Sequence, residues 1–179
     1  SVRTIVVLNI LDRLFTESRD TDNMRRIKVL LVAGNCRLLE ALSRVVSTDK
    51  ELHIVAQAGN AYTARDMILE NDPDVMLLCD DLPRMKGIIF LAKLMPQYPV
   101  RTVVLCDLER EKAAYDAGAV AAVMLSLSGK ESDGELDEIL AMQKVNEHLK
   151  KAYYPHGIPA ASDVLSNTYY PSGKVYSSV

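Results

Sequence analysis

Short apolar runs alternate with amphipathic segments over most of the chain. Residues 27–33 (IKVLLVA) are a continuous apolar run of strand length, and residues 36–47 repeat apolar side chains at the spacing of one helical face. The same alternation of strand and helix patterns continues to residue 151. The predicted strands are 27–33, 52–58, 75–79, 102–106 and 120–125, and the predicted helices are 36–47, 60–71, 88–95, 109–118 and 135–151.

These strands are apolar on both faces, which indicates a parallel sheet that helices cover on both sides. Right-handed crossovers then make the sheet doubly wound. The predicted fold class is α/β, with a flavodoxin-like five-stranded parallel sheet in the order 2-1-3-4-5. Pro73 and Pro99 precede predicted strands and Gly118 ends the predicted fourth helix, as such breakers should.

Two segments lie outside this alternation, so we divide the chain into an N-terminal apolar extension (1–24), an α/β domain (25–151) and a C-terminal tail (152–179). The apolar spacing within 1–24 fits an amphipathic helix, although residues 4–10 alone fit a strand equally well. The tail is rich in Pro, Tyr and Ser, which is typical of irregular structure. Exposed, the apolar extension would be a large hydrophobic patch, so it is expected to pack on its own domain, on a second copy or on a partner. The side chains expected to make contacts are Val2, Ile5, Val6, Leu11, Leu14, Phe15, Tyr153, Tyr154, Tyr169 and Tyr170.

Composition and charge narrow the classes of function. The 179 residues are 49% hydrophobic and 25% charged, with a formal net charge of -3 and no long Lys/Arg run, so no nucleic-acid partner is expected. No apolar run approaches the ~20 residues that span a bilayer, so no membrane partner is expected either. The three cysteines are odd in number and lack a C-x-x-C pattern, which argues against disulfides and structural zinc and indicates a reducing, cytoplasmic setting. No metal and no cofactor are expected.

Six segments together carry a family resemblance over residues 26–150. They are IKVLLV, ELHIVAQAGNAYTA, NDPDVMLL, DLPRMKGIIFLAKLMPQYPV, TVVL and DAGAV, in this order and spacing. They resemble the receiver domain of two-component response regulators, most strongly the N-terminal receiver of the chemotaxis methylesterase CheB. The resemblance implies phosphoryl transfer to an aspartate at the end of the third strand, assisted by a magnesium ion. The tail is too short for a catalytic hydrolase domain, so no enzyme activity is expected.

The resemblance also locates the residues that this chemistry needs, and none of the expected residue types is present. The acidic pair falls at Ala33 and Gly34, and the phosphoacceptor at Cys79, whose soft sulfur is a poor ligand for magnesium. The Ser/Thr position is Cys106 and the Lys position is Leu125. We therefore predict a degenerate receiver, a pseudo-receiver that cannot be phosphorylated.

Asp80 and Asp81 follow the phosphoacceptor position and need separate treatment. Successive strand residues point to opposite faces, so Asp80 is predicted to point away from the mouth where the strands end. Asp81 is predicted to lie in the solvated turn before Pro83.

The cysteines permit a sharper hypothesis, because Cys36, Cys79 and Cys106 all follow or end neighbouring strands and are predicted to cluster at one mouth. Such a cluster is either a redox switch or soft-metal site, or a set of small apolar side chains that fill a vacated pocket. We favour the second reading, because no Lys or Arg is expected at this mouth to lower a thiol pKa.

The predicted function is that of a protein-protein interaction or structural module, self-assembling through its terminal extensions into a homo-oligomer or an open polymer. The alternative is a receiver-like signalling domain that thiol redox chemistry or a soft metal switches. The resemblance further implies a binding face on the fourth helix, the fifth strand and the fifth helix, with a chemotaxis or signalling protein as a candidate partner. On the fourth helix this face carries Glu109, Lys112, Tyr115 and Asp116.

Overall fold

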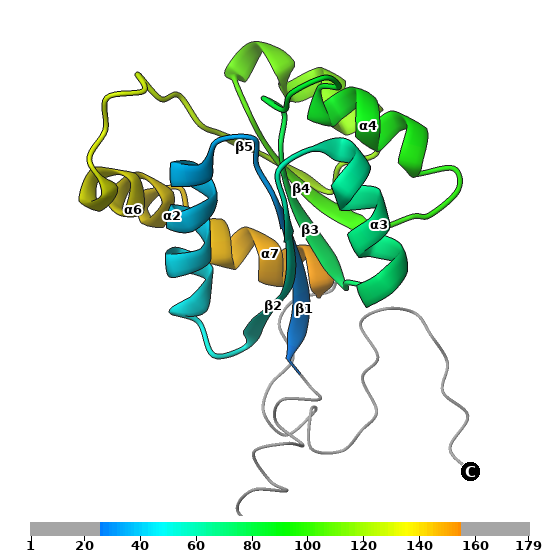
Figure 1. Cartoon of the computed structure of the whole chain (residues 1–179), viewed down its shortest axis with the longest axis horizontal. Helices are drawn as coiled ribbons and strands as arrows, with labels where there is room; N and C mark the ends of the chain where they lie inside the picture. Colours follow the sequence, from blue (N-terminus) through cyan, green and yellow to red (C-terminus); the bar gives the residue numbers. More distant parts are fainter. Residues whose placement is uncertain (1–25, 155–179) are drawn as a thin grey trace, which may run out of the picture.

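A five-stranded parallel sheet forms the centre of the computed structural model, which describes residues 26–154 (Figure 1). Its strand order, β2-β1-β3-β4-β5, confirms the predicted flavodoxin-like topology. The strands are β1 (Ile27–Val32), β2 (Leu52–Ala58), β3 (Val75–Cys79), β4 (Arg101–Cys106) and β5 (Ala121–Met124). The helices are α2 (Cys36–Ser47), α3 (Ala61–Asn71), α4 (Gly87–Leu94), the 3-10 turn η1 (Leu108–Arg110), α5 (Glu111–Asp116), α6 (Asp133–Met142) and α7 (Val145–Tyr153).

The helices cover the sheet in two layers, with α2, α6 and α7 on one face and α3, α4 and α5 on the other (Figure 1). Within β1, Val29 and Leu31 pack into the first layer, whereas Leu30 and Val32 pack into the second. All residues of β3 are buried, which explains why the strand sequence shows no polar alternation. Each fully buried leucine of this kind stabilises the fold by about 2 kcal/mol.

Helix ends follow the expected local chemistry in part. The Asn35 side chain accepts hydrogen bonds from the backbone of Arg37 and Leu38 and so caps α2. Asp107 occupies the capping position of η1, but its side chain makes no capping hydrogen bond. Gly118 adopts a φ of 111°, which lets the chain turn after α5.

The fifth predicted helix (135–151) is two helices, α6 and α7, and this part of the prediction is wrong. The chain breaks at Lys144, which has a left-handed φ of 54°. Leu140 of α6 and Val145 of α7, on either side of the break, are both fully buried. The break lets α6 pack on α2 while α7 packs on the sheet.

The C-terminal helix extends beyond the predicted domain boundary at residue 151. Arg101 Nη1 at the start of β4 donates to the carbonyls of Ala152 (3.1 Å) and Tyr153 (2.7 Å), which satisfies acceptors at the end of α7. Tyr153 and Tyr154 are half-buried against the core, and their ring centroids lie 4.7 Å apart. These two predicted interaction residues therefore contact their own domain. The remaining predicted interaction residues lie outside the described residues.

No helix within residues 26–154 has the length and apolar character needed to cross a membrane.

Candidate functional site

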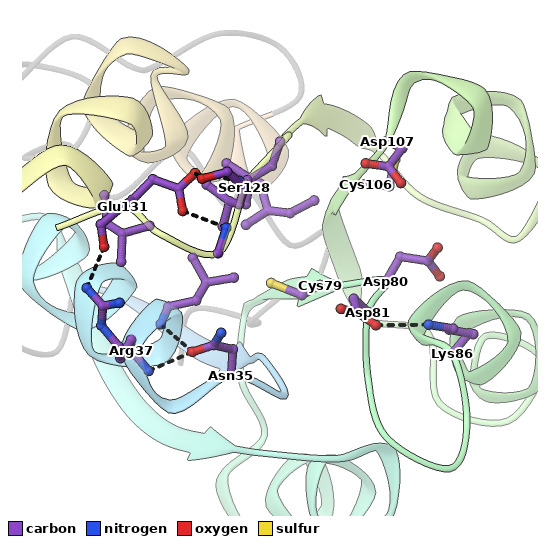
Figure 2. A pocket seen from close by; sticks show the side chains of 16 residues that line it. Asn35, Arg37, Cys79, Asp80, Asp81, Lys86, Cys106, Asp107, Ser128 and Glu131 are labelled. Atoms are coloured by element: carbon purple, nitrogen blue, oxygen red, sulfur yellow. Dashed lines mark hydrogen bonds and ion pairs between the residues drawn. The ribbon is translucent and has the colours of Figure 1, made fainter. Parts of the chain in front are cut away.

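A pocket of about 540 Å³ lies at the carboxyl ends of β1, β3 and β4, and we call it the mouth pocket (Figure 2). This is the edge at which parallel α/β sheets bind ligands. The pocket is lined by Asn35, Arg37, Leu38, Cys79, Asp80, Asp81, Lys86, Leu105, Cys106, Asp107, Leu125, Leu127, Ser128, Gly129, Glu131 and Leu136.

The β1 side of the mouth has no room for the acidic pair. Ala33 is buried, and a Cβ atom built on Gly34 would lie 2.8 Å from Pro83 Cδ and 3.1 Å from the Asp81 carbonyl oxygen. Atoms this close cannot be accommodated unless the loop at 81–83 moves. The loop after β3 therefore occupies the space that a carboxylate at residue 34 would need.

Cys79 ends β3 at the phosphoacceptor position and is only 4% exposed. Burial, followed by the nearby charges of Asp81 and Asp80, raises the pKa of the Cys79 thiol to about 12. The sulfur is therefore neutral at ordinary pH, and a neutral thiol is neither a nucleophile nor a metal ligand.

The other two positions of the implied phosphate site are equally inert. Cys106 ends β4, and burial followed by the charge of Asp80 raises the pKa of its thiol. Leu125 follows β5, packs against the core and uses its backbone N–H to donate to the Cys106 carbonyl at 3.0 Å. An isobutyl group at this position offers no charge to a phosphate.

Of the three thiols predicted to cluster, the structure brings two, Cys79 and Cys106, to the mouth pocket. Cys36 is exposed at the start of α2 and does not line the mouth pocket. Cys79 pairs in register with Leu105, which places Cys106 one residue further along its strand. Successive strand residues face opposite ways, so Cys79 packs into the α2, α6 and α7 layer and Cys106 into the α3, α4 and α5 layer. Among the described residues, no group of three His, Cys, Asp or Glu side chains could hold a metal ion.

Contrary to prediction, cationic side chains do reach this mouth. Arg37 and Lys86 both line the pocket, and each is paired: Arg37 Nη2 lies 3.1 Å from Asp133 Oδ1, and Lys86 Nζ lies 2.9 Å from Asp81 Oδ1. Figure 2 shows Lys86 turned towards Asp81 and Arg37 turned towards Glu131, on either side of Cys79. Lys86 lies in the segment DLPRMKG that carries the resemblance and Arg37 lies outside the six segments, but the resemblance assigns no role at the mouth to either residue.

A short polar loop after β5 closes one side of the pocket. The Glu131 carboxylate accepts hydrogen bonds from the backbone N–H and hydroxyl of Ser128 and from the N–H of Gly129. These bonds, those from Ser128 first, lower the pKa of Glu131 to about 2. Arg37 Nη2 donates to the Glu131 carbonyl at 2.6 Å and so ties this loop to α2.

Asp80 points away from the Cys79 sulfur (Figure 2), but it lines the mouth pocket, so the prediction that it points away from this mouth is wrong. It has partners that the sequence did not indicate, because its Oδ2 accepts from Arg110 Nε at 2.9 Å and its Oδ1 accepts from the Ile88 N–H at 3.1 Å. Asp81 lies in the exposed turn, as predicted, with its side chain 96% exposed. Both carboxylates are therefore engaged by cations of the same chain.

Comparisons with known proteins agree with this fold and extend to sequence. A protein-glutamate methylesterase/protein-glutamine glutaminase of Syntrophomonas wolfei is 46% identical over 98 residues, which is 54% of this chain and 29% of that protein. One of Rhizobium johnstonii is 32% identical over 148 residues, covering 79% of this chain and 40% of the relative. The chain thus spans less than half the length of these relatives. No family model matches the chain.

Among solved structures, the response regulator domain of Thermotoga maritima CheB superposes with a TM-score of 0.53 and 24% identity, covering 67% of this chain and 98% of that one. The receiver domain of the Mycobacterium tuberculosis response regulator NarL gives a TM-score of 0.52 at 20% identity, with the same two shares. Both likenesses concern the fold. Residues 26–154 therefore have the fold of response-regulator receiver domains, and the chain is similar in sequence to part of these methylesterases.

Proposed function

We propose that this receiver domain cannot be phosphorylated and acts as a protein-protein interaction or structural module. The observation that carries the proposal is Cys79, a buried neutral thiol at the position where the resemblance requires an ionised aspartate. Gly34 supports the same conclusion, because the loop at 81–83 fills the space of its missing side chain.

The remaining carboxylates at the mouth do not make a substitute magnesium site. Magnesium is bound through carboxylate oxygens and water in near-octahedral geometry. Asp80 is held by Arg110, and Asp81 is held by Lys86. Asp107 also lines the pocket, but its side chain is exposed and makes no capping contact.

The test is exposure of the full chain to acetyl phosphate with Mg²⁺, followed by intact mass spectrometry. We expect no gain of a phosphoryl group, and no change in the thermal unfolding midpoint when beryllofluoride is added. If a phosphoryl gain is observed, the variant Asp80→Asn tests whether Asp80 is the acceptor. A phosphoryl gain that this variant abolishes would show that Asp80 is an acceptor, and would overturn the proposal.

We also propose that the terminal extensions join copies of the chain. The support is the apolar pattern of residues 1–24, together with exposed apolar side chains on the domain itself. Leu108 in η1, Tyr115 in α5 and Val120 before β5 are 70%, 47% and 47% exposed, and Glu109, Lys112 and Asp116 are exposed as well. This is the side on which the resemblance implies a binding face.

Size-exclusion chromatography with light scattering tests the assembly. The expected mass of the full chain is a multiple of 19.8 kDa. Combined Leu11→Ser, Leu14→Ser and Phe15→Ser substitutions should reduce it to the monomer. Tyr62→Ser is the matched control, because Tyr62 is 55% exposed on α3 and the substitution should leave the mass unchanged. A monomeric wild-type chain would contradict self-assembly and leave the phosphorylation result unaffected.

A further inference from the structure

Asp80 connects two segments of the mouth that are far apart in the sequence. Its side chain is 13% exposed, and its two oxygens lie 2.9 Å from Arg110 Nε and 3.4 Å from Arg110 Nη2. Arg110 ends η1, the turn that follows β4 and leads into α5. The ion pair thus links the segment after β3 to the segment after β4.

Asp80 is itself held firmly in place. Its backbone N–H donates to the Leu105 carbonyl of β4, and its carbonyl accepts from the N–H of Gly87, both at 2.9 Å. Its Oδ1 accepts from the N–H of Ile88 in the first turn of α4 at 3.1 Å. One carboxylate therefore joins the first turn of α4 to η1.

Asp80 follows Cys79 and Arg110 comes after Cys106, so the ion pair joins the segments after the two strand ends to which the resemblance assigns phosphoryl chemistry. In phosphorylatable receivers the Ser or Thr that ends the fourth strand binds a phosphoryl oxygen, and here that position is Cys106. We propose that the Asp80–Arg110 pair fixes η1 and the start of α5 against α4 in a single arrangement without any phosphoryl group. The α5 side of the domain is then presented in one constant conformation.

A charge-assisted interaction of this type is stronger than an exposed one. The Asp80 side chain is 13% exposed and that of Arg110 is 41% exposed, and arginine presents donors in a rigid fork. The neighbouring Asp81–Lys86 pair has the same distance, 2.9 Å, but its side chains are 96% and 54% exposed. Exposed pairs contribute little to stability, so Asp81 provides a control that matches Asp80 in charge and position.

Hydrogen exchange of the full chain, followed by mass spectrometry, tests the proposal. The variants are Asp80→Asn, Arg110→Gln and the double variant; asparagine retains an oxygen that can accept from the Ile88 N–H. In each single variant the amide hydrogens of residues 107–116 should exchange about tenfold faster than in the wild-type chain, as expected for losing one charge-assisted hydrogen bond. The double variant should exchange no faster than either single variant, because both remove the same contact.

Asp81→Asn should leave exchange at 107–116 unchanged. Unchanged exchange in both Asp80→Asn and Arg110→Gln, or an equal increase in Asp81→Asn, would overturn the proposal. If Asp80→Asn does not fold, Arg110→Lys serves with Arg110→Gln, since it keeps the charge but loses the fork. The measurement uses no phosphoryl donor, so its outcome is separate from that of the phosphorylation test.

Discussion

At the scale of single residues, Cys79 decides what the mouth of the sheet can do. Cys79→Asp would place a carboxyl group where burial and two neighbouring carboxylates raise a thiol pKa to about 12. The same surroundings should raise the pKa of the new carboxyl group above the ~4 of a free aspartate. A raised pKa in the folded state means that stability is lost as pH rises above ~4.

We therefore expect Cys79→Asp to lower the free energy of unfolding by about 2–4 kcal/mol at pH 8 and by less at pH 5. It should also remain unreactive to acetyl phosphate, because Ala33, Gly34 and Leu125 supply no metal ligand or cation. Urea denaturation at both pH values measures the effect. Cys79→Ser is the neutral control. An equal pH dependence of the free energy of unfolding in both variants would contradict a raised pKa for the new carboxyl group.

The structure predicts opposite effects of a glycine-to-alanine substitution on stability at two glycines of the described domain. Gly34→Ala brings a methyl group to within 2.8 Å of Pro83 Cδ and should lower the free energy of unfolding by about 1–3 kcal/mol. Gly134→Ala meets no atom within 4 Å in the first turn of α6 and should raise it by about 0.5–1 kcal/mol. Denaturant titrations of the two variants compare them directly. If Gly34→Ala is as stable as wild type, the loop at 81–83 does not block this position.

The residues of the site could be predicted from the sequence only at the positions to which the family motif assigns a role. The motif located Cys79, Cys106 and Leu125, because strand ends fix their positions. It gave no signal for the contacts made by Arg110 and Arg37, since these side chains come from a turn and a helix face whose packing depends on the folded chain. The separation of Cys79 from Cys106 follows from side-chain alternation once the register between β3 and β4 is known.

At the scale of elements, the break between α6 and α7 depends on one residue in a left-handed conformation. Lys144→Gly should raise the free energy of unfolding by about 1 kcal/mol, because glycine adopts a φ near 54° without a Cβ penalty. Lys144→Ala removes the same side chain but keeps the penalty, so it should bring no gain. Thermal unfolding of both variants measures the difference, and equal effects would show that the lysine side chain matters instead of its backbone.

The strands were the most predictable elements and the helix ends the least. The strands are short, largely apolar runs, and their predicted bounds agree with the structure to within a residue at each end. The α6–α7 segment shows apolar residues on both sides of the break, so helical periodicity alone concealed it. Its detection needs the sheet, since α7 packs on β3 and β4 while α6 packs on α2.

At the scale of the whole molecule, the sheet itself separates the two buried thiols, and this bears on the redox alternative. Cys79 and Cys106 lie in different layers, both with raised thiol pKa values, whereas Cys36 is exposed. A disulfide between the buried pair would need their Cβ atoms about 4 Å apart and pointing towards each other. Side chains on opposite faces of a sheet do not meet this requirement.

Titration of the native chain with an aromatic disulfide reagent should therefore show fast reaction of Cys36 alone, with Cys79 and Cys106 reacting at the rate at which the domain opens. Cys36→Ser should abolish the fast phase and leave the slow phase unchanged. Denaturant should release all three thiols at once. A Cys79–Cys106 disulfide formed by mild oxidant under native conditions would contradict this arrangement. It would also restore the thiol-switched receiver as the better account, because only a rearranged sheet edge could bring the two sulfurs together.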